Sequence, residues 1–145
     1  MSELVDQHLY RVIKKFKTRN PLEIAEEKNI LVLYEDLGDI LGYYNSVSRI
    51  KFIHINNSLQ KNIENFVCAH ELGHALIHPN ENTPQLSKAT LKSEWTVERE
   101  ANEFATKLLI DGSHEEYEIR GKYDILDYYG LPYEMERFIH KEDKY

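Results

Sequence analysis

Residues 66–78 read Phe-Val-Cys-Ala-His-Glu-Leu-Gly-His-Ala-Leu-Ile-His and contain the pattern His-Glu-x-x-His at 70–74. Apolar residues surround this pattern on nearly all sides of a helical wheel, which predicts a buried helix. At about 3.6 residues per turn, His70 and His74 lie one turn apart on the same face of that helix. Buried imidazoles and a buried carboxylate need partners, and a metal ion would supply them. We therefore interpret His70 and His74 as ligands of one metal ion, with Glu71 as a general base beside it.

A third ligand is expected because a catalytic zinc ion normally has three protein ligands and one open position. After a polar loop that contains two prolines, residues 94–109 predict a second helix. Glu98 shares its face with the small and apolar residues of this helix, so we expect it to be the third ligand. Glu94, one turn earlier, is the alternative ligand, and a carboxylate that interacts with the helix dipole is the alternative role for Glu98. Asn102 is placed to hydrogen-bond a ligand imidazole and fix its tautomer.

The opposite face of the second helix carries three charged residues, Glu100, Glu103 and Lys107. We expect Glu100 to be solvated, and we expect Glu103 and Lys107 to form a surface pair one turn apart. His78 comes at the end of the first helix, where capping or packing is the expected role. A contact to the substrate or to the oxyanion is the alternative for this histidine.

These residues predict a hydrolytic mechanism. Zinc held by the two imidazoles and Glu98 would lower the pKa of a water in its fourth position toward about 7. Glu71 would accept the proton of this water as it attacks the carbonyl of a peptide bond. The same carboxyl group would then deliver the proton to the leaving amine.

Composition narrows the class of protein further. The chain has 145 residues and a net charge of −7, which argues against direct binding to nucleic acid. Its single cysteine, Cys68, excludes an internal disulfide framework. Neither a signal-like segment nor an apolar run of about 18 residues occurs, so we expect a cytoplasmic protein without membrane contact. The oligomeric state is left open.

The length predicts one domain over residues 1–145. Within it we expect an N-terminal amphipathic helix in residues 1–19 and a C-terminal helical segment in residues 111–145. Residues 20–110 would form the core and contain both helices that carry the metal ligands.

Three β-prone runs within the core predict a small sheet. The first run is residues 30–34, and residues 42–44 and 49–55 predict a hairpin with a turn at 45–48. Asn, Asn and Ser at 56–58 are then expected to end the last strand and cap the central helix.

Two blocks of the sequence resemble the ImmA/IrrE family of zinc metallopeptidases in order and spacing. The first is residues 66–78, and the second, residues 98–109, reads Glu-Arg-Glu-Ala-Asn-Glu-Phe-Ala-Thr-Lys-Leu-Leu. The resemblance implies a small zincin-like α+β domain, gluzincin-like in its ligands, with the central helix packed on a short sheet among surrounding helices. It also implies one Zn²⁺ per chain, bound by His70, His74 and Glu98, with Glu71 as the catalytic residue.

Members of this family often occur in phages and mobile elements, where they cut or inactivate a helix-turn-helix repressor. The resemblance therefore implies a zinc-dependent endopeptidase that acts as an anti-repressor by hydrolysing a peptide bond in such a repressor. The alternative is a non-catalytic module that binds and sequesters the repressor without cleavage. Retention of Glu71 favours the enzyme, because a binding module needs no general base.

Overall fold

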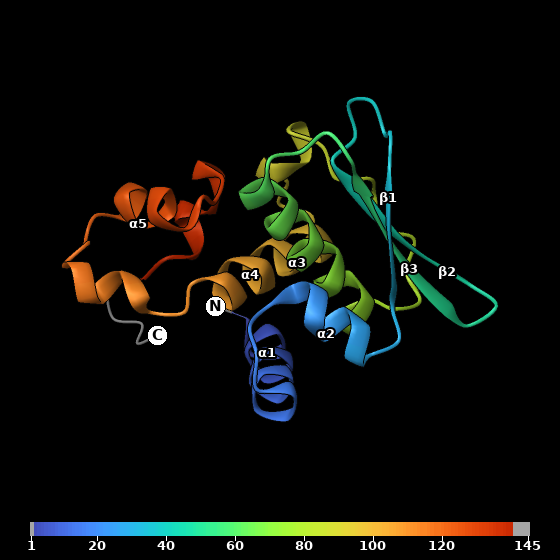
Figure 1. The fold of residues 1–145 in the computed structure, drawn as a ribbon, viewed down its shortest axis with the longest axis horizontal. Helices are drawn as coiled ribbons and strands as arrows, with labels where there is room; N and C mark the ends of the chain where they lie inside the picture. Colours follow the sequence, from blue (N-terminus) through green and yellow to red (C-terminus); the bar gives the residue numbers. More distant parts are fainter. Residues whose placement is uncertain (1, 141–145) are drawn as a thin grey trace.

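Helix α3 (Lys61–Ile77) lies at the centre of the computed structural model, which describes residues 2–140. It packs between a three-stranded sheet and helix α4 (Thr96–Leu109) (Figure 1). Residues 66–75 of α3 are all buried, as the apolar surroundings of the His-Glu-x-x-His pattern predict. The fold is thus α+β with a buried central helix, in agreement with the expected fold class.

The sheet has the order β1-β3-β2, in which β1 (Leu31–Glu35) runs parallel to β3 (Ile50–Asn56). Strand β2 (Gly42–Val47) pairs antiparallel with β3 and forms the predicted hairpin. The predicted turn at 45–48 is wrong, because pairing continues to Val47 and Ile50. Ser48 and Arg49, with φ angles of 51° and 68°, make a two-residue turn. Positive φ at both turn residues matches the twist of the two strands, so the hairpin needs no longer loop.

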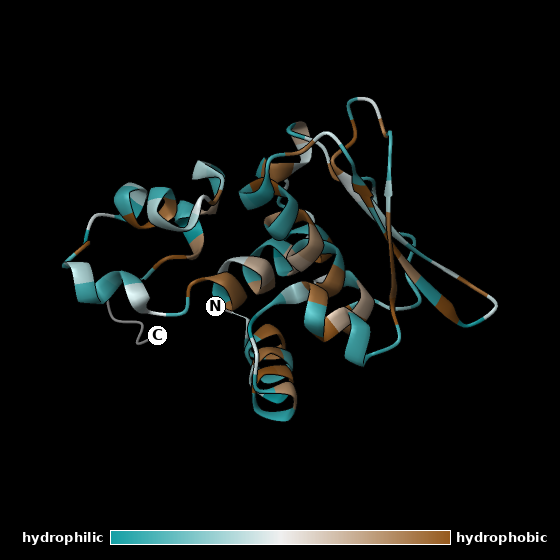
Figure 2. Ribbon diagram, viewed as in Figure 1, coloured by the Kyte–Doolittle hydropathy of each residue, from teal (hydrophilic) through white to brown (hydrophobic). Residues whose placement is uncertain are grey.

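One face of the sheet packs against α3 and contributes Ile53 and Ile55, which are fully buried. Side chains alternate along a strand, so Leu31, Leu33 and Ile50 point to the opposite face. These three residues are exposed, and the hydrophobic stretch along β1 is brown in Figure 2.

The start of α3 differs from the predicted cap at 56–58. Gln60 is the N-cap residue and makes no side-chain hydrogen bond to the helix. The side-chain amide of Asn56 instead donates to the carbonyls of Gly38 and Ile40, each at 2.9 Å. Asn56 therefore holds the connection between β1 and β2 and leaves the capping position to a later residue.

Helix α1 (Glu3–Phe16) packs against α4, and Ser2 caps it by accepting a hydrogen bond from the Val5 backbone N–H. Helix α2 (Pro21–Glu27) begins after Asn20, whose side chain accepts hydrogen bonds from two backbone N–H groups at its start. Between the two helices, Arg19 donates to three backbone carbonyls at the end of α4. A cation is favourable at a helix C-terminus because the free carbonyls carry negative partial charge.

The segment after α3 is more structured than the loop predicted there, since Gly42 forms a β-bridge with the buried Leu86. A 3-10 turn, η1 (Ala89–Lys92), follows before α4. After α4 come three short helical elements: η2 (Ser113–Tyr117), α5 (Lys122–Tyr129) and η3 (Tyr133–Phe138). Residues 1 and 141–145 of the predicted domain lie outside the described residues. Within residues 2–140, no helix is both long enough and apolar enough to cross a membrane.

Candidate metal centre

Gly73 of α3 lies at the contact between α3 and α4. A Cβ atom added to Gly73 would lie 3.3 Å from the Cα of Ala101 and 3.2 Å from a ring carbon of Phe104. Small residues at this contact let the two helix backbones come near each other. Side chains from the start of α4 can therefore reach the imidazoles of α3.

Four side chains meet at this contact, and all four belong to residues without solvent exposure: His70, Glu71, His74 and Glu98. One ligand atom from each of the first three lies within 4.8 Å of the other two. The Glu98 carboxylate joins them from α4, with one oxygen 2.7 Å from His74 Nε2 and the other 3.4 Å from His70 Nε2. The structure thus brings together the three predicted ligands and the predicted base. Figure 1 shows the two helices that carry them side by side.

Several polar atoms of this cluster are buried without a hydrogen-bond partner in the described structure. They are His70 Nε2, both carboxylate oxygens of Glu71, and Glu98 Oε2. Leaving a buried polar atom unpaired typically costs about 1–3 kcal/mol of folding stability. A group of such atoms at one place therefore destabilises the fold unless a ligand binds there. A divalent cation would satisfy them, and two imidazole nitrogens with a carboxylate oxygen form a donor set that suits zinc.

His70 is oriented from α4. Its Nδ1 lies 2.8 Å from the side-chain oxygen of Asn102, which is also fully buried. An amide oxygen can only accept, so Nδ1 carries the proton and Nε2 keeps its lone pair toward the cluster. The structure therefore brings Asn102 to the imidazole, as its position one turn after Glu98 predicts.

His74 is flanked by a second pair of residues. Its Nδ1 lies 3.1 Å from Nδ1 of His78, and Nε2 of His78 lies 2.9 Å from a carboxylate oxygen of Glu100. His78 thus lies on the side of the His74 ring that faces away from Glu98, and both its nitrogens contact protein groups. This position favours packing over contact with a substrate.

The expectation that Glu100 is solvated is wrong, since its side chain is only 12% exposed. Glu103 and Lys107 do pair one turn apart, as predicted, but their expected place at the surface is wrong because both residues are buried. Lys107 Nζ donates to Glu103 at 3.0 Å and to Asp6 of α1 at 2.7 Å. Helix α1 covers this face of α4, and the wheel of α4 alone contains no information about that packing.

Glu94, the alternative third ligand, is remote from the cluster. Its side chain is 77% exposed and pairs with Arg137 at 2.5 Å.

The pKa values of the two carboxyl groups of the cluster shift in opposite directions. Burial is the largest cause that raises the pKa of Glu71, to about 8, and the charge of Glu98 adds to it while His70 opposes it. Burial also acts to raise the pKa of Glu98, but the two imidazoles beside its carboxylate, His70 and His74, lower it to about 2. Burial lowers the pKa of His74 to about 4, so its ring is neutral at pH 7. The arrangement combines a permanent anion, a neutral imidazole and a carboxyl group able to exchange a proton near neutral pH.

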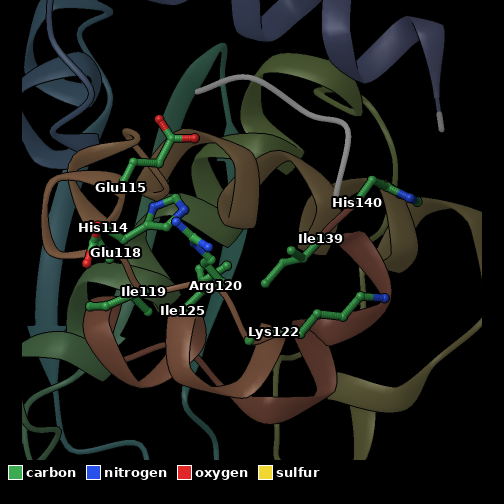
Figure 3. A pocket seen from close by; sticks show the side chains of 10 residues that line it. His114, Glu115, Glu118, Ile119, Arg120, Lys122, Ile125, Ile139 and His140 are labelled. Atoms are coloured by element: carbon green, nitrogen blue, oxygen red, sulfur yellow. The ribbon is translucent and has the colours of Figure 1, made fainter.

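A separate pocket of about 720 Å³ lies in the C-terminal segment, among residues of η2, α5 and their neighbours (Figure 3). Its lining includes Arg120, Lys122 and His140 and none of the four residues of the His-Glu cluster. The sequence contains no motif that predicts this hollow.

Comparison with known proteins gives the family. The profile of the IrrE N-terminal-like domain, a peptidase family, matches residues 25–138. The chain is 45% identical over 108 residues to "Uncharacterized immunity region protein 2" of Bacillus phage phi105. The aligned region covers 74% of this chain and 68% of that protein. The chain is also 32% identical over 111 residues to "Metallopeptidase ImmA" of Bacillus subtilis (strain 168). That aligned region covers 75% of this chain and 64% of the relative.

The matched region therefore spans about two thirds of the length of these curated relatives, at 68% and 64%. No solved structure gives a significant match. The family match extends over most of the chain and includes both helices that carry the His-Glu cluster. The chain accordingly belongs to the peptidase family of the IrrE N-terminal-like domain.

Proposed function

We propose that the protein is a zinc-dependent endopeptidase that hydrolyses a peptide bond in a helix-turn-helix transcriptional repressor. The observation that carries the proposal is the convergence of buried, unpaired ligand atoms from α3 and α4 beside the Glu71 carboxylate. The relative named Metallopeptidase ImmA supports the metal-dependent chemistry, and the relative from a phage immunity region supports a regulatory role.

Each residue of the cluster has a defined task in this proposal. His70 and His74 would bind zinc through Nε2, and Glu98 would bind it through its carboxylate. A bound zinc ion would supply Lewis-acid polarisation of the substrate carbonyl and a lowered pKa for the attacking water. Glu71 would accept the proton of that water, because its carboxylate lies beside the ligand atoms and a bound zinc ion would favour its ionised form. Glu71 would then protonate the leaving amine.

The expected substrate follows from the resemblance to the ImmA/IrrE family and from charge. A net charge of −7 disfavours DNA and favours a basic partner, such as the DNA-binding part of a repressor. A protein with this substrate would act in the cytoplasm.

Zinc content is the first test. The purified chain, freed of metal bound to any affinity tag, should contain about one zinc per molecule. Glu98→Ala should lose most of it, whereas Glu94→Ala is the matched control because that side chain is exposed and pairs with Arg137. A wild-type chain that takes up no zinc after reconstitution would contradict the proposal.

Cleavage is the second test. The chain is co-expressed with each helix-turn-helix protein encoded beside its gene, and intact masses are measured. Wild type should produce two fragments of one such protein, and Glu71→Gln should retain zinc and produce none. If Glu71→Gln releases an uncut repressor from its operator as well as wild type does, sequestration is the activity and the peptidase proposal fails.

A further inference from the structure

We propose that Glu100 is a positioning residue that acts through His78 to hold His74 in the tautomer required for metal binding. The inference rests on the proposed function, since it treats His74 as a zinc ligand. It concerns two residues outside the set of ligands and base, one at the end of α3 and one in the first turns of α4.

The geometry is a continuous row of hydrogen-bonding groups. His74 Nε2 faces Glu98 at 2.7 Å, and its Nδ1 faces His78 Nδ1 at 3.1 Å. His78 Nε2 faces Glu100 Oε1 at 2.9 Å. The rings of both histidines are buried and the Glu100 side chain is 12% exposed, so the protein limits the access of water to the row.

Only one arrangement of protons fits this row when His74 binds a metal. A ligand nitrogen must present a lone pair, so a neutral His74 that binds through Nε2 carries its proton on Nδ1. That N–H then donates to Nδ1 of His78, which must be unprotonated. His78 consequently carries its own proton on Nε2 and donates it to the Glu100 carboxylate, which can only accept. Glu100 thereby sets the direction of both hydrogen bonds.

The carboxylate end of the row is held by the N-terminus of α1. The hydroxyl of Ser2 lies 3.5 Å from Glu100 Oε2, and the Ser2 backbone N–H donates to Glu103 at 3.3 Å. Glu100 is therefore positioned by residues on two helices, α1 and α4, while it orients a ligand on a third. His70 is supported differently, by one neutral amide on α4.

The test measures zinc affinity by competition with a chelator of known affinity. Glu100→Ala should weaken zinc binding by about 10- to 100-fold, the usual effect of removing a group that orients a ligand imidazole. Glu100→Gln keeps the size and an acceptor oxygen, so it should recover part of the loss. Glu103→Gln is the matched control, because Glu103 contacts α1 and Lys107 but not His78; its zinc affinity should equal that of wild type.

A spectroscopic measurement on the wild-type chain avoids any folding defect of a variant. Long-range ¹H–¹⁵N spectra of the zinc-bound protein should show His78 protonated on Nε2 and His74 protonated on Nδ1. A His78 protonated on Nδ1, or a folded Glu100→Ala with wild-type zinc affinity, would overturn the positioning role while leaving the zinc site intact. Absence of zinc binding in wild type would instead overturn the proposed function, and the positioning role with it.

Discussion

Helix α4 has two buried polar faces, and they differ in how completely their charges are paired. The face toward α3 carries Glu98, which has a carboxylate oxygen without a partner beside two imidazoles. The face toward α1 carries Glu100 and Glu103, whose carboxylates contact His78, Ser2 and Lys107. Burial of a carboxylate is common to both faces and does not identify a ligand site. Unpaired donor atoms that converge on one point distinguish the face suited to a metal ion.

Metal removal should have the largest effect and should act through the α3 face alone. A ligand present at 1,000 times its dissociation constant stabilises the folded state by about 4 kcal/mol. Chelation should therefore lower the Tm of the wild-type chain by roughly 10 °C, as measured by calorimetry. The same treatment should leave the Tm of Glu98→Ala unchanged, and an equal shift in both proteins would place the bound metal elsewhere.

The α1 face is tested by Lys107→Met, which removes the cation between Glu103 and Asp6. Breaking a buried ion pair leaves one charge uncompensated and destabilises by about 3 kcal/mol. We expect the free energy of unfolding, measured with urea, to fall by this amount while the zinc content stays unchanged. Replacing both Lys107 and Glu103 by Met should recover much of this loss, since the one carboxylate then left without its partner, Asp6, is half exposed to water. Loss of zinc in Lys107→Met would mean that the two faces are not independent.

The contrast between the faces also marks what sequence can predict. Helical spacing predicts that Glu98 and Glu100 point in different directions, because this is local to one helix. The expectation that Glu98 joins His70 and His74 adds a chemical rule, since a catalytic zinc ion normally has three protein ligands. The burial of Glu100 depends on the packing of α1, and the contact from Ser2 to Glu103 joins residues 101 positions apart. One signal was present in the sequence: His78 follows His74 by the same four residues that separate His74 from His70. That spacing places a third imidazole next to the ligand pair, and such a row needs a carboxylate at its end.

The hairpin shows the same limit on a smaller scale. Strands β2 and β3 were predicted from their β-prone residues, but the turn was not, because Asn45 and Ser46 have turn composition and yet pair with Phe52 and Lys51. Ser48 and Arg49 adopt positive φ without being glycine, which composition does not reveal.

The smallest predicted effect concerns Glu71, the second carboxylate of the His-Glu cluster at the α3 face, in the metal-free chain. Burial raises the pKa of Glu71 from its ordinary value of 4.5 to about 8 in the folded chain, so between these pH values the folded state holds a proton that the unfolded state has lost. Stability from this group is present below pH 4.5 and is lost as pH rises toward 8. Between pH 5 and 7 the loss amounts to about 2 kcal/mol, at 1.36 kcal/mol per pKa unit with part of it offset by coupling to His70.

Glu71→Gln removes this titration, so the metal-free variant should become more stable than wild type at pH 7 and approach it at pH 5. Urea unfolding at the two pH values measures the difference. The exposed Glu94→Gln is the control and should differ from wild type by no more than about 0.5 kcal/mol at either pH. A stability difference between Glu71→Gln and wild type that does not change with pH would show that Glu71 is ionised in the metal-free fold. In that case the metal-free chain would bury two anionic carboxylates, Glu71 and Glu98, without a cation beside them. A bound metal ion would then stabilise the fold by more than the unpaired ligand atoms alone indicate.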